Sequence, residues 1–137
     1  MVTPFKFRAK EIKTGEWVEG DLHLLCRVPH IHVDLTHKYA INTDTICVFT
    51  RLHDKKDKEV YDGDLISIPL SDGSKAIHEI HISEDMLSVE IRNCNGDYDF
   101  HQNLFNVLKY SWWQEYQSDI EVIGNKYDNP ELINKED

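Results

Sequence analysis

The sequence predicts a mainly β, antiparallel, barrel-like or sandwich-like single domain with one or two short helices. Three observations support this fold class. Apolar and polar residues alternate with a period of two in most segments, which is typical of half-buried strands. The helical period is scarce, and clusters of Gly, Asp, Asn and Ser recur between the apolar runs as turn signals. Residues 1–137 show no internal repeat or linker, so we expect one domain, with residues 134–137 frayed.

The N-terminal third predicts one hairpin followed by one long loop. Residues 5–9 place two Phe and one Ala on a common face, and residues 17–25 form the returning strand after a polar turn. Gly20 within the second strand predicts a bulge or a close backbone approach. Residues 27–44 contain few strong strand formers, so we expect a loop excursion that includes a short strand at most.

The central segment predicts buried strands separated by polar turns. Residues 46–50 form a compact apolar run, and the charged residues 51–58 are interpreted as a solvated turn region. Residues 59–68 predict a strand, a Gly turn and another strand. Residues 76–82 and 87–92 alternate in the same way and predict a second hairpin.

The C-terminal part predicts one more strand and two short helical pieces. Apolar residues at helical spacing permit a short helix over residues 102–109. Residues 120–124 predict a late strand. Residues 129–133 begin with an N-cap residue and a Pro at the first helical position, which predicts a single terminal turn of helix.

Composition restricts the classes of partner. Fifteen Lys+Arg against twenty-five Asp+Glu give a net charge of −10. Nucleic-acid binding requires local cations that displace phosphate counterions, so nucleic acid is not an expected partner. The apolar runs are too short to span a membrane, and residues 1–6 lack the apolar run of a secretory signal, so we expect a cytoplasmic protein. Cys26, Cys47 and Cys94 are odd in number and have no metal-type spacing, and we expect three reduced thiols.

Three segments of the chain form a recognisable pattern. The first is FKFRA at residues 5–9 followed by GEWVEGDL at 15–22, the second is FTRLHDKKDKEVYDGDLI at 49–66, and the third is IEVIGNKYDNPEL at 120–132. In this order and spacing they are specific, and they bracket almost the whole chain. Together they resemble the YopX family of phage and prophage proteins. The resemblance implies a β-rich, barrel-like domain of phage or prophage origin, located in the cytoplasm of a bacterial host cell. It implies no catalytic residue and no cofactor.

The second segment departs from the family pattern at two glycines, where this chain has Arg51 and Asp57. Asp57 suits a turn, because Asp adopts positive φ more easily than most residues. Arg51 leaves two alternatives. Either this backbone position does not need positive φ, or the turn is remodelled.

The densest acidic group of the second segment is a candidate site, formed by Glu59, Asp62 and Asp64 around Tyr61 and Gly63. In a structural interpretation, Asp62 and Gly63 form a turn and Asp64 accepts backbone N–H bonds from it. In a functional interpretation, the same carboxylates bind a divalent cation or act as an acid–base pair. We prefer the structural interpretation, because no matching nucleophile or phosphate cradle is evident elsewhere in the sequence.

A histidine group is the other candidate for metal chemistry. His30 and His32 share a face if their segment is a strand, and His37 is a third candidate ligand. A metal site needs three or four convergent ligands, and this spacing matches no reference pattern. No metal site is therefore assigned.

An aromatic cluster precedes the last strand and consists of Tyr110, Trp112, Trp113 and Tyr116. Base stacking requires interleaved basic residues, and Lys109 alone is near, so packing in the core or at a subunit interface is favoured. We therefore predict a homo-oligomer, with a host or phage protein as a further candidate partner.

The leading functional hypothesis is a small, soluble, non-enzymatic protein that acts through binding or assembly. Two alternatives remain open. One is an acidic inhibitor of a host DNA-binding protein, suggested by the net charge of −10. The other is a hydrolase that uses the cluster of Glu59, Asp62 and Asp64.

Overall fold

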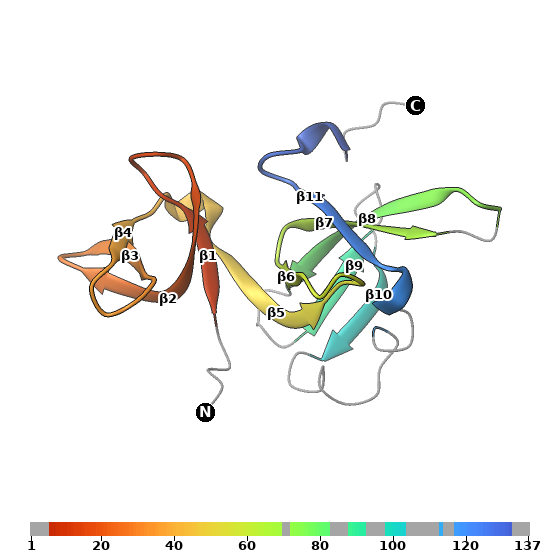
Figure 1. Cartoon of the computed structure of the whole chain (residues 1–137), viewed down its shortest axis with the longest axis horizontal. Helices are drawn as coiled ribbons and strands as arrows, with labels where there is room; N and C mark the ends of the chain where they lie inside the picture. The colour runs from red at the N-terminus through yellow and green to blue at the C-terminus, as the bar shows by residue number, and fades with distance from the viewer. Residues whose placement is uncertain are drawn as a thin grey trace. The chain divides into compact units, whose positions relative to one another are not determined.

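The computed structural model describes residues 6–69, 72–82, 88–92, 98–103, 113 and 117–132. These residues form antiparallel strands joined by turns and short 3-10 helices (Figure 1). The predicted mainly β, antiparallel fold class is confirmed, and neither of the two strand orders closes into a barrel. By internal contacts the chain divides into two compact units, which we call unit 1 (Met1–Phe49) and unit 2 (Thr50–Asp137).

Unit 1 consists of four complete strands and the first part of a fifth. They are β1 (Phe7–Lys10), β2 (Trp17–Leu25), β3 (Val28–His32), β4 (Lys38–Ala40) and the beginning of β5 (Cys47–His53). They pair in the order β4-β3-β2-β1-β5, with every pair antiparallel. The predicted hairpin of the first two strands is confirmed by its register, in which Ala9 faces Val18.

The predicted loop at residues 27–44 is wrong over much of its length, because this segment forms β3, β4 and the 3-10 helix η1 (Thr43–Thr45). Cross-strand pairing holds these strands, with His30 opposite His23 on one side and Ala40 on the other. Strand formation here follows from neighbouring strands rather than from local propensity, which is weak in a segment that contains three His and Pro29.

The core of unit 1 lies on one face of β1, β2 and β3. Buried Ala9, Ile31 and Ile41 form its centre, and partly buried Phe7, Val18, Leu22 and Ile46 pack against them. The close backbone approach predicted at Gly20 is confirmed, because a Cβ atom there would collide with the carbonyl oxygen of His32.

Unit 2 contains the second part of β5 and six further strands. They are β6 (Glu59–Tyr61), β7 (Asp64–Pro69), β8 (Lys75–Ile82), β9 (Ser88–Arg92), β10 (Tyr98–Asn103) and β11 (Glu121–Asn125). Five of them pair in the antiparallel order β10-β9-β8-β7-β11, and β6 pairs with β5. The predicted hairpin of β8 and β9 is confirmed, with Ile80 opposite Ile91 and both side chains buried.

The helical predictions have mixed outcomes. The terminal turn is confirmed as the 3-10 helix η4 (Pro130–Leu132), which follows the 3-10 helix η3 (Gln117–Asp119) and β11. The helix predicted over residues 102–109 is wrong at its start, since Gln102 and Asn103 belong to β10, and residues 104–109 lie outside the described residues. Within the described part of the chain, no helix has the length and apolar character needed to cross a membrane.

Candidate functional site

The turn between β6 and β7 is built by the acidic motif of the second family-like segment. Asp62 and Gly63 form this turn, with Gly63 at φ +90°. The Gly63 N–H donates to the carbonyl oxygen of Ile80 at 2.8 Å. The buried carboxylate of Asp64 accepts a hydrogen bond from the Tyr61 N–H at 2.7 Å. In this geometry Asp64 satisfies a backbone donor of the turn.

The other two carboxylates of the motif also have partners in unit 2. Asp62 Oδ1 accepts a hydrogen bond from the Ile82 N–H at 3.1 Å and lies 3.9 Å from His81 Nδ1. Glu59 Oε1 accepts a hydrogen bond from the Tyr61 hydroxyl at 3.1 Å. The Asp62 contacts connect the turn to β8, and the Glu59 contact lies within β6.

The third family-like segment contacts the same turn. The Lys126 N–H donates to the carbonyl oxygen of Gly63 at 2.9 Å. A Cβ atom added to Gly63 would lie 3.3 Å from Cε2 of Tyr127, so the backbone and this ring are closely packed. The second and third segments, separated in sequence by more than fifty residues, therefore form one structural feature.

The loop that follows β11 is held by two asparagines. Asn125 Oδ1 accepts a hydrogen bond from the Asp128 N–H at 2.9 Å, and Asn125 Nδ2 donates to Asp128 Oδ2 at 3.1 Å. The Asn129 side-chain oxygen lies so close to Gly124 that a Cβ atom at residue 124 would collide with it. The hydrogen bonds of Asn125 therefore account for Asn125 and Asp128 in this loop.

Asp54 is a buried carboxylate that the sequence interpretation missed. The prediction of a solvated region over residues 51–58 is confirmed at residues 55–58, which are exposed, and wrong at residues 51–54, because β5 extends to His53 and Asp54 is only 1% exposed. Asp54 Oδ1 accepts from the N–H groups of Lys56 and Lys58 at 2.8 and 2.9 Å. Asp54 Oδ2 accepts from the Val122 N–H at 3.0 Å, which joins the turn after β5 to β11.

The pKa of the Asp54 carboxyl is lowered by its hydrogen-bond partners. Its burial by itself raises the pKa, but the N–H donors of Val122, Lys58 and Lys56 together outweigh burial and hold the pKa below the ordinary value of an aspartate. A carboxylate whose charged form accepts several backbone hydrogen bonds is a structural anchor of its fold.

The predicted aromatic cluster is described at one of its four positions. Trp113 is 1% exposed, and its indole N–H donates to the carbonyl oxygen of His53 at 2.8 Å. Trp113 therefore packs within unit 2. Tyr110, Trp112 and Tyr116 lie outside the described residues.

His32 and His37, two of the histidines considered as metal ligands, contact different residues. His37 Nδ1 lies 2.9 Å from Asp34 Oδ1, and the rings of His23 and His32 stack with their centroids 4.2 Å apart. Burial and the neighbouring His23 lower the pKa of His32. Over the described ranges, no group of three or more His, Cys, Asp or Glu side chains is arranged to hold a metal ion.

Charge is distributed unevenly between the two units. Unit 1 holds six Lys+Arg and six Asp+Glu, whereas unit 2 holds nine and nineteen. The whole net charge of −10 therefore belongs to unit 2, and unit 1 is formally neutral. Electrostatic repulsion of a partner of like charge is weaker for a neutral unit than for a strongly charged one.

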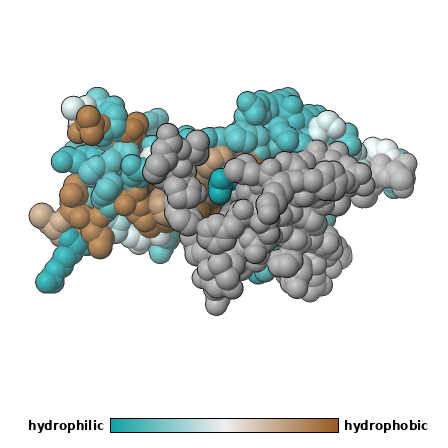
Figure 2. All heavy atoms as spheres, turned by 90° about the horizontal axis from the view of Figure 1, so that it is seen from below, coloured by the Kyte–Doolittle hydropathy of each residue, from teal (hydrophilic) through white to brown (hydrophobic). Residues whose placement is uncertain are grey.

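Exposed hydrophobic side chains are concentrated in unit 1. Of the six large ones found among the described residues, five lie there: Ile12, Leu24, Val28, Val33 and Leu35. Figure 2 shows hydrophobic residues, in brown, over this part of the chain. Ile12 and Val28 lie together in one hollow of this unit, whereas Val33 and Leu35 lie together in another.

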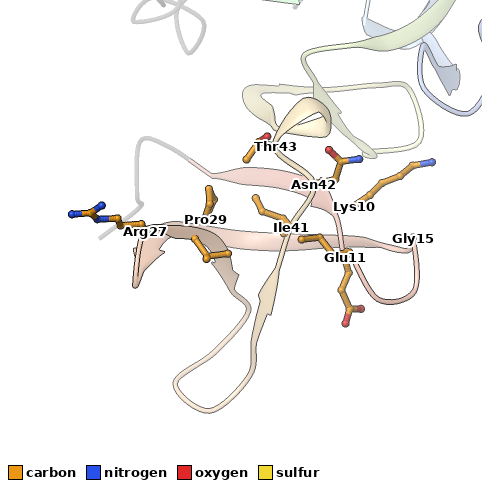
Figure 3. A pocket seen from close by; sticks show the side chains of 10 residues that line it. Lys10, Glu11, Gly15, Arg27, Pro29, Ile41, Asn42 and Thr43 are labelled. Carbon is orange, nitrogen blue, oxygen red and sulfur yellow. The ribbon is translucent and has the colours of Figure 1, made fainter.

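Unit 1 also contains an open groove with a volume of about 510 Å³ (Figure 3). Buried Ile41 and half-buried Pro29 line its floor, and exposed Ile12 and Val28 line its sides. The backbone of the groove is fixed, since the Ile41 N–H donates to Pro29 and the Ile12 N–H donates to Ala40, at 3.2 and 2.9 Å. Its volume falls within the range of ligand pockets, which are mostly apolar and preformed.

Two cationic residues flank this groove. Figure 3 shows Lys10 and Arg27 at opposite ends, with Pro29 and Ile41 between them and with both charged side chains extending outward from the groove. Glu11 also lines the groove, but its side chain points away from Ile41 in the same view, and Glu11 Oε2 accepts a hydrogen bond from the Thr14 hydroxyl at 2.8 Å.

Arg27 lies in the tight turn that joins β2 to β3. Leu25 pairs with Val28, and the two residues between them, Cys26 and Arg27, have φ values of +52° and +69°. Two consecutive residues at positive φ correspond to a type I′ turn, for which Asn-Gly is strongly preferred. A non-glycine residue in the left-handed region costs roughly 1–2 kcal/mol, so this turn is strained.

Comparison with known proteins identifies the family. A family model described as YopX protein matches residues 5–134, which include both units. The chain belongs to the YopX family. A curated relative is the SPbeta prophage-derived uncharacterized protein YopX of Bacillus subtilis strain 168, which is 32% identical over 77 residues. That match covers 56% of this chain and 51% of the relative, so the chain spans about half the length of this YopX protein.

A solved structure supports the fold of this YopX-family chain. The crystal structure of protein EF1440 from Enterococcus faecalis matches 94% of this chain and 97% of that chain, with a TM-score of 0.54. The sequence identity is 21%, so the similarity concerns the fold alone.

The YopX pattern also explains an unusual backbone in β5. Arg51 and Asp57 occupy positions that are typically glycine in the pattern, and their φ values are +70° and +63°. The alternative in which position 51 does not need positive φ is therefore wrong. The left-handed backbone is kept, and this chain places an arginine in it.

Proposed function

We propose that this YopX-family chain is a phage- or prophage-encoded, non-enzymatic binding protein that acts in the host cytoplasm through unit 1. The supporting observation is the groove of unit 1, together with the exposed hydrophobic side chains of a unit that has no net charge. Protein contact surfaces have an apolar centre and a polar rim. The groove likewise has Pro29 and Ile41 between Lys10 and Arg27.

The partner class that fits is a protein, from the host, from the phage or a second copy of this chain. The apolar floor of the groove is continuous with the core of unit 1 through Ile41. The homo-oligomer predicted from the sequence would use this surface rather than Trp113, whose indole is buried in unit 2.

The two alternative functions have less support. An acidic inhibitor would act through unit 2, but several of its carboxylates have internal partners. Asp54 and Asp64 accept backbone hydrogen bonds, and Glu121 is paired with Lys56 at 2.9 Å. A hydrolase would need Asp64, which is 1% exposed and bonded to the Tyr61 N–H.

Site-specific photo-crosslinking in cells tests the proposed function. A photoreactive residue at position 28, in the groove, should give a discrete protein adduct, whereas one at the exposed Asp72 of unit 2 should not. The adduct identifies the partner, and a mass that corresponds to two copies indicates self-association. Introduction of Ile12→Asp should abolish the adduct from position 28. Equal adducts from both positions, or none from either, would show that unit 1 is not the binding surface.

A further inference from the structure

We propose that the groove of unit 1 binds an extended peptide segment of a partner protein, in which an apolar side chain is followed or preceded by an acidic residue. Arg27 is the residue that recognises the acid. This inference rests on the proposed function of unit 1 as a binding surface, and it adds the chemistry of the partner.

The shape of the groove favours a chain segment. Ile12 and Val28 on its sides are exposed, whereas Ile41 in its floor is buried, so the groove is open along its length. An enclosed pocket suits a small molecule that is almost fully buried. An open groove with an apolar floor suits an extended peptide that inserts one side chain and continues beyond the groove.

The charges of the groove select an acidic neighbour for that side chain. Arg27 is exposed and makes no ion pair with any described residue, and a guanidinium is suited to bidentate recognition of a carboxylate. The Glu11 carboxylate does not pair with Arg27, since it accepts a hydrogen bond from the Thr14 hydroxyl. At the opposite end, the ammonium of Lys10 lies 5.4 Å from the centre of the Trp17 ring.

The strained turn supports the same role for Arg27. Cys26 and Arg27 have positive φ at the tip of the β2–β3 hairpin, where Asn-Gly would be free of strain. Backbone strain that persists at an exposed position is a feature of functional sites. In this chain the strained turn carries Arg27, which lies at one end of the apolar groove.

A display library of random peptides, selected against the full chain, tests the proposal. We expect enriched sequences that contain Asp or Glu beside a large apolar residue. A synthetic peptide with the enriched sequence should bind at least about tenfold more weakly to Arg27→Glu than to the unmodified chain. Replacement of the acidic residue of the peptide by Lys should recover binding to Arg27→Glu. The control Lys38→Glu, at an exposed position of β4 outside the groove, should bind the original peptide as the unmodified chain does.

A second variant separates recognition from folding. The pair Cys26→Asn and Arg27→Gly supplies the preferred residues of a type I′ turn, so it should raise thermal stability while it weakens peptide binding. Unchanged binding by this variant would overturn the role of Arg27.

The outcomes also distinguish this inference from the proposed function. Enriched peptides that are apolar without an acid, and that lose binding to Ile12→Asp alone, would overturn the acidic partner while the binding function stands. Peptides that bind equally well to Ile12→Asp, or no enrichment at all, would overturn both. Enrichment of basic peptides would overturn the acidic partner and leave the binding function standing.

Discussion

The buried carboxylate of Asp54 accepts a hydrogen bond from the backbone N–H of Val122 at 3.0 Å, across 68 positions of sequence. The same carboxylate closes its own turn through the N–H groups of Lys56 and Lys58. One side chain therefore fixes the turn after β5 and attaches it to β11. The second and third YopX-like segments meet here, as they also do where the Lys126 N–H donates to the carbonyl oxygen of Gly63.

We predict that Asp54→Ala strongly destabilises unit 2. The substitution leaves three backbone N–H groups without their acceptor, and a lost charge-assisted hydrogen bond costs about 1.5–3 kcal/mol. We expect a loss of at least about 3 kcal/mol in the free energy of unfolding, measured by urea denaturation. The control Asp72→Ala removes an exposed carboxylate that bonds to Ser74, and it should cost less than about 1 kcal/mol. Equal losses in the two variants would contradict the anchoring role.

The stabilisation by Asp54 should depend on pH in a defined direction. Its pKa in the folded protein is lowered, so the unfolded chain binds the proton more readily. The contribution is fully present above the ordinary aspartate pKa of about 3.9 and is lost as the pH falls through the lower folded value. The difference in unfolding free energy between the unmodified chain and Asp54→Asn should therefore be constant near neutral pH and shrink below about pH 4. A difference that grows on acidification would reverse this assignment.

Arg51→Gly should stabilise the protein, although it removes a charged side chain from a strand. Arg51 has a φ of +70°, which costs an arginine roughly 1–2 kcal/mol, whereas the greater chain entropy of Gly offsets roughly 0.5–1 kcal/mol of that gain. We expect a net gain of about 0.5–1 kcal/mol in urea denaturation. His53→Gly, in the same strand but without positive φ, should instead destabilise by about 1 kcal/mol. Destabilisation by both variants would show that the Arg51 side chain contributes more than its backbone costs.

The strands that could be predicted are those in which burial follows local alternation. Val89 and Ile91 in β9 are buried as their period-2 pattern indicates, and the hairpin of β1 and β2 follows from the same pattern. By contrast, β3 and β4 were missed because their pairing partners, rather than their composition, place them in a sheet. His30 is a weak strand former that lies between two paired neighbours.

The candidate site was predicted where chemistry is local and missed where it is not. The Asp62–Gly63 turn is recognisable from two adjacent residues, and Gly63 has the positive φ that such a turn uses. The burial of Asp54 depends on Val122, which local sequence does not indicate. The groove includes Val28 and Pro29 of β3, and it was missed because the sequence does not indicate a strand there.

We expect Asp64→Ala to lower stability by about 1.5–3 kcal/mol, because the Tyr61 N–H loses its buried acceptor. The effect should be the same with a chelator and with millimolar Mg²⁺ or Ca²⁺. Thermal melts of the unmodified chain and the variant measure both quantities. If the acidic motif is instead a cation site, the unmodified chain will melt at a higher temperature with the cation, and Asp64→Ala will not.

Gly63→Ala and Gly73→Ala form a matched pair that separates backbone strain from packing. Both glycines have a φ of +90°, so each substitution should cost roughly 1–2 kcal/mol through the backbone alone. A Cβ atom at Gly73 meets nothing within 4 Å, whereas one at Gly63 lies 3.3 Å from the Tyr127 ring. Because this ring belongs to the loop attached to the turn through Lys126, the excess cost of Gly63→Ala measures the contact between the two YopX-like segments. We expect a larger loss of unfolding free energy for Gly63→Ala, which falls to that of Gly73→Ala when Tyr127 is also replaced by Ala. A cost at Gly63 no greater than that at Gly73 would mean that the two segments are adjacent without being energetically coupled.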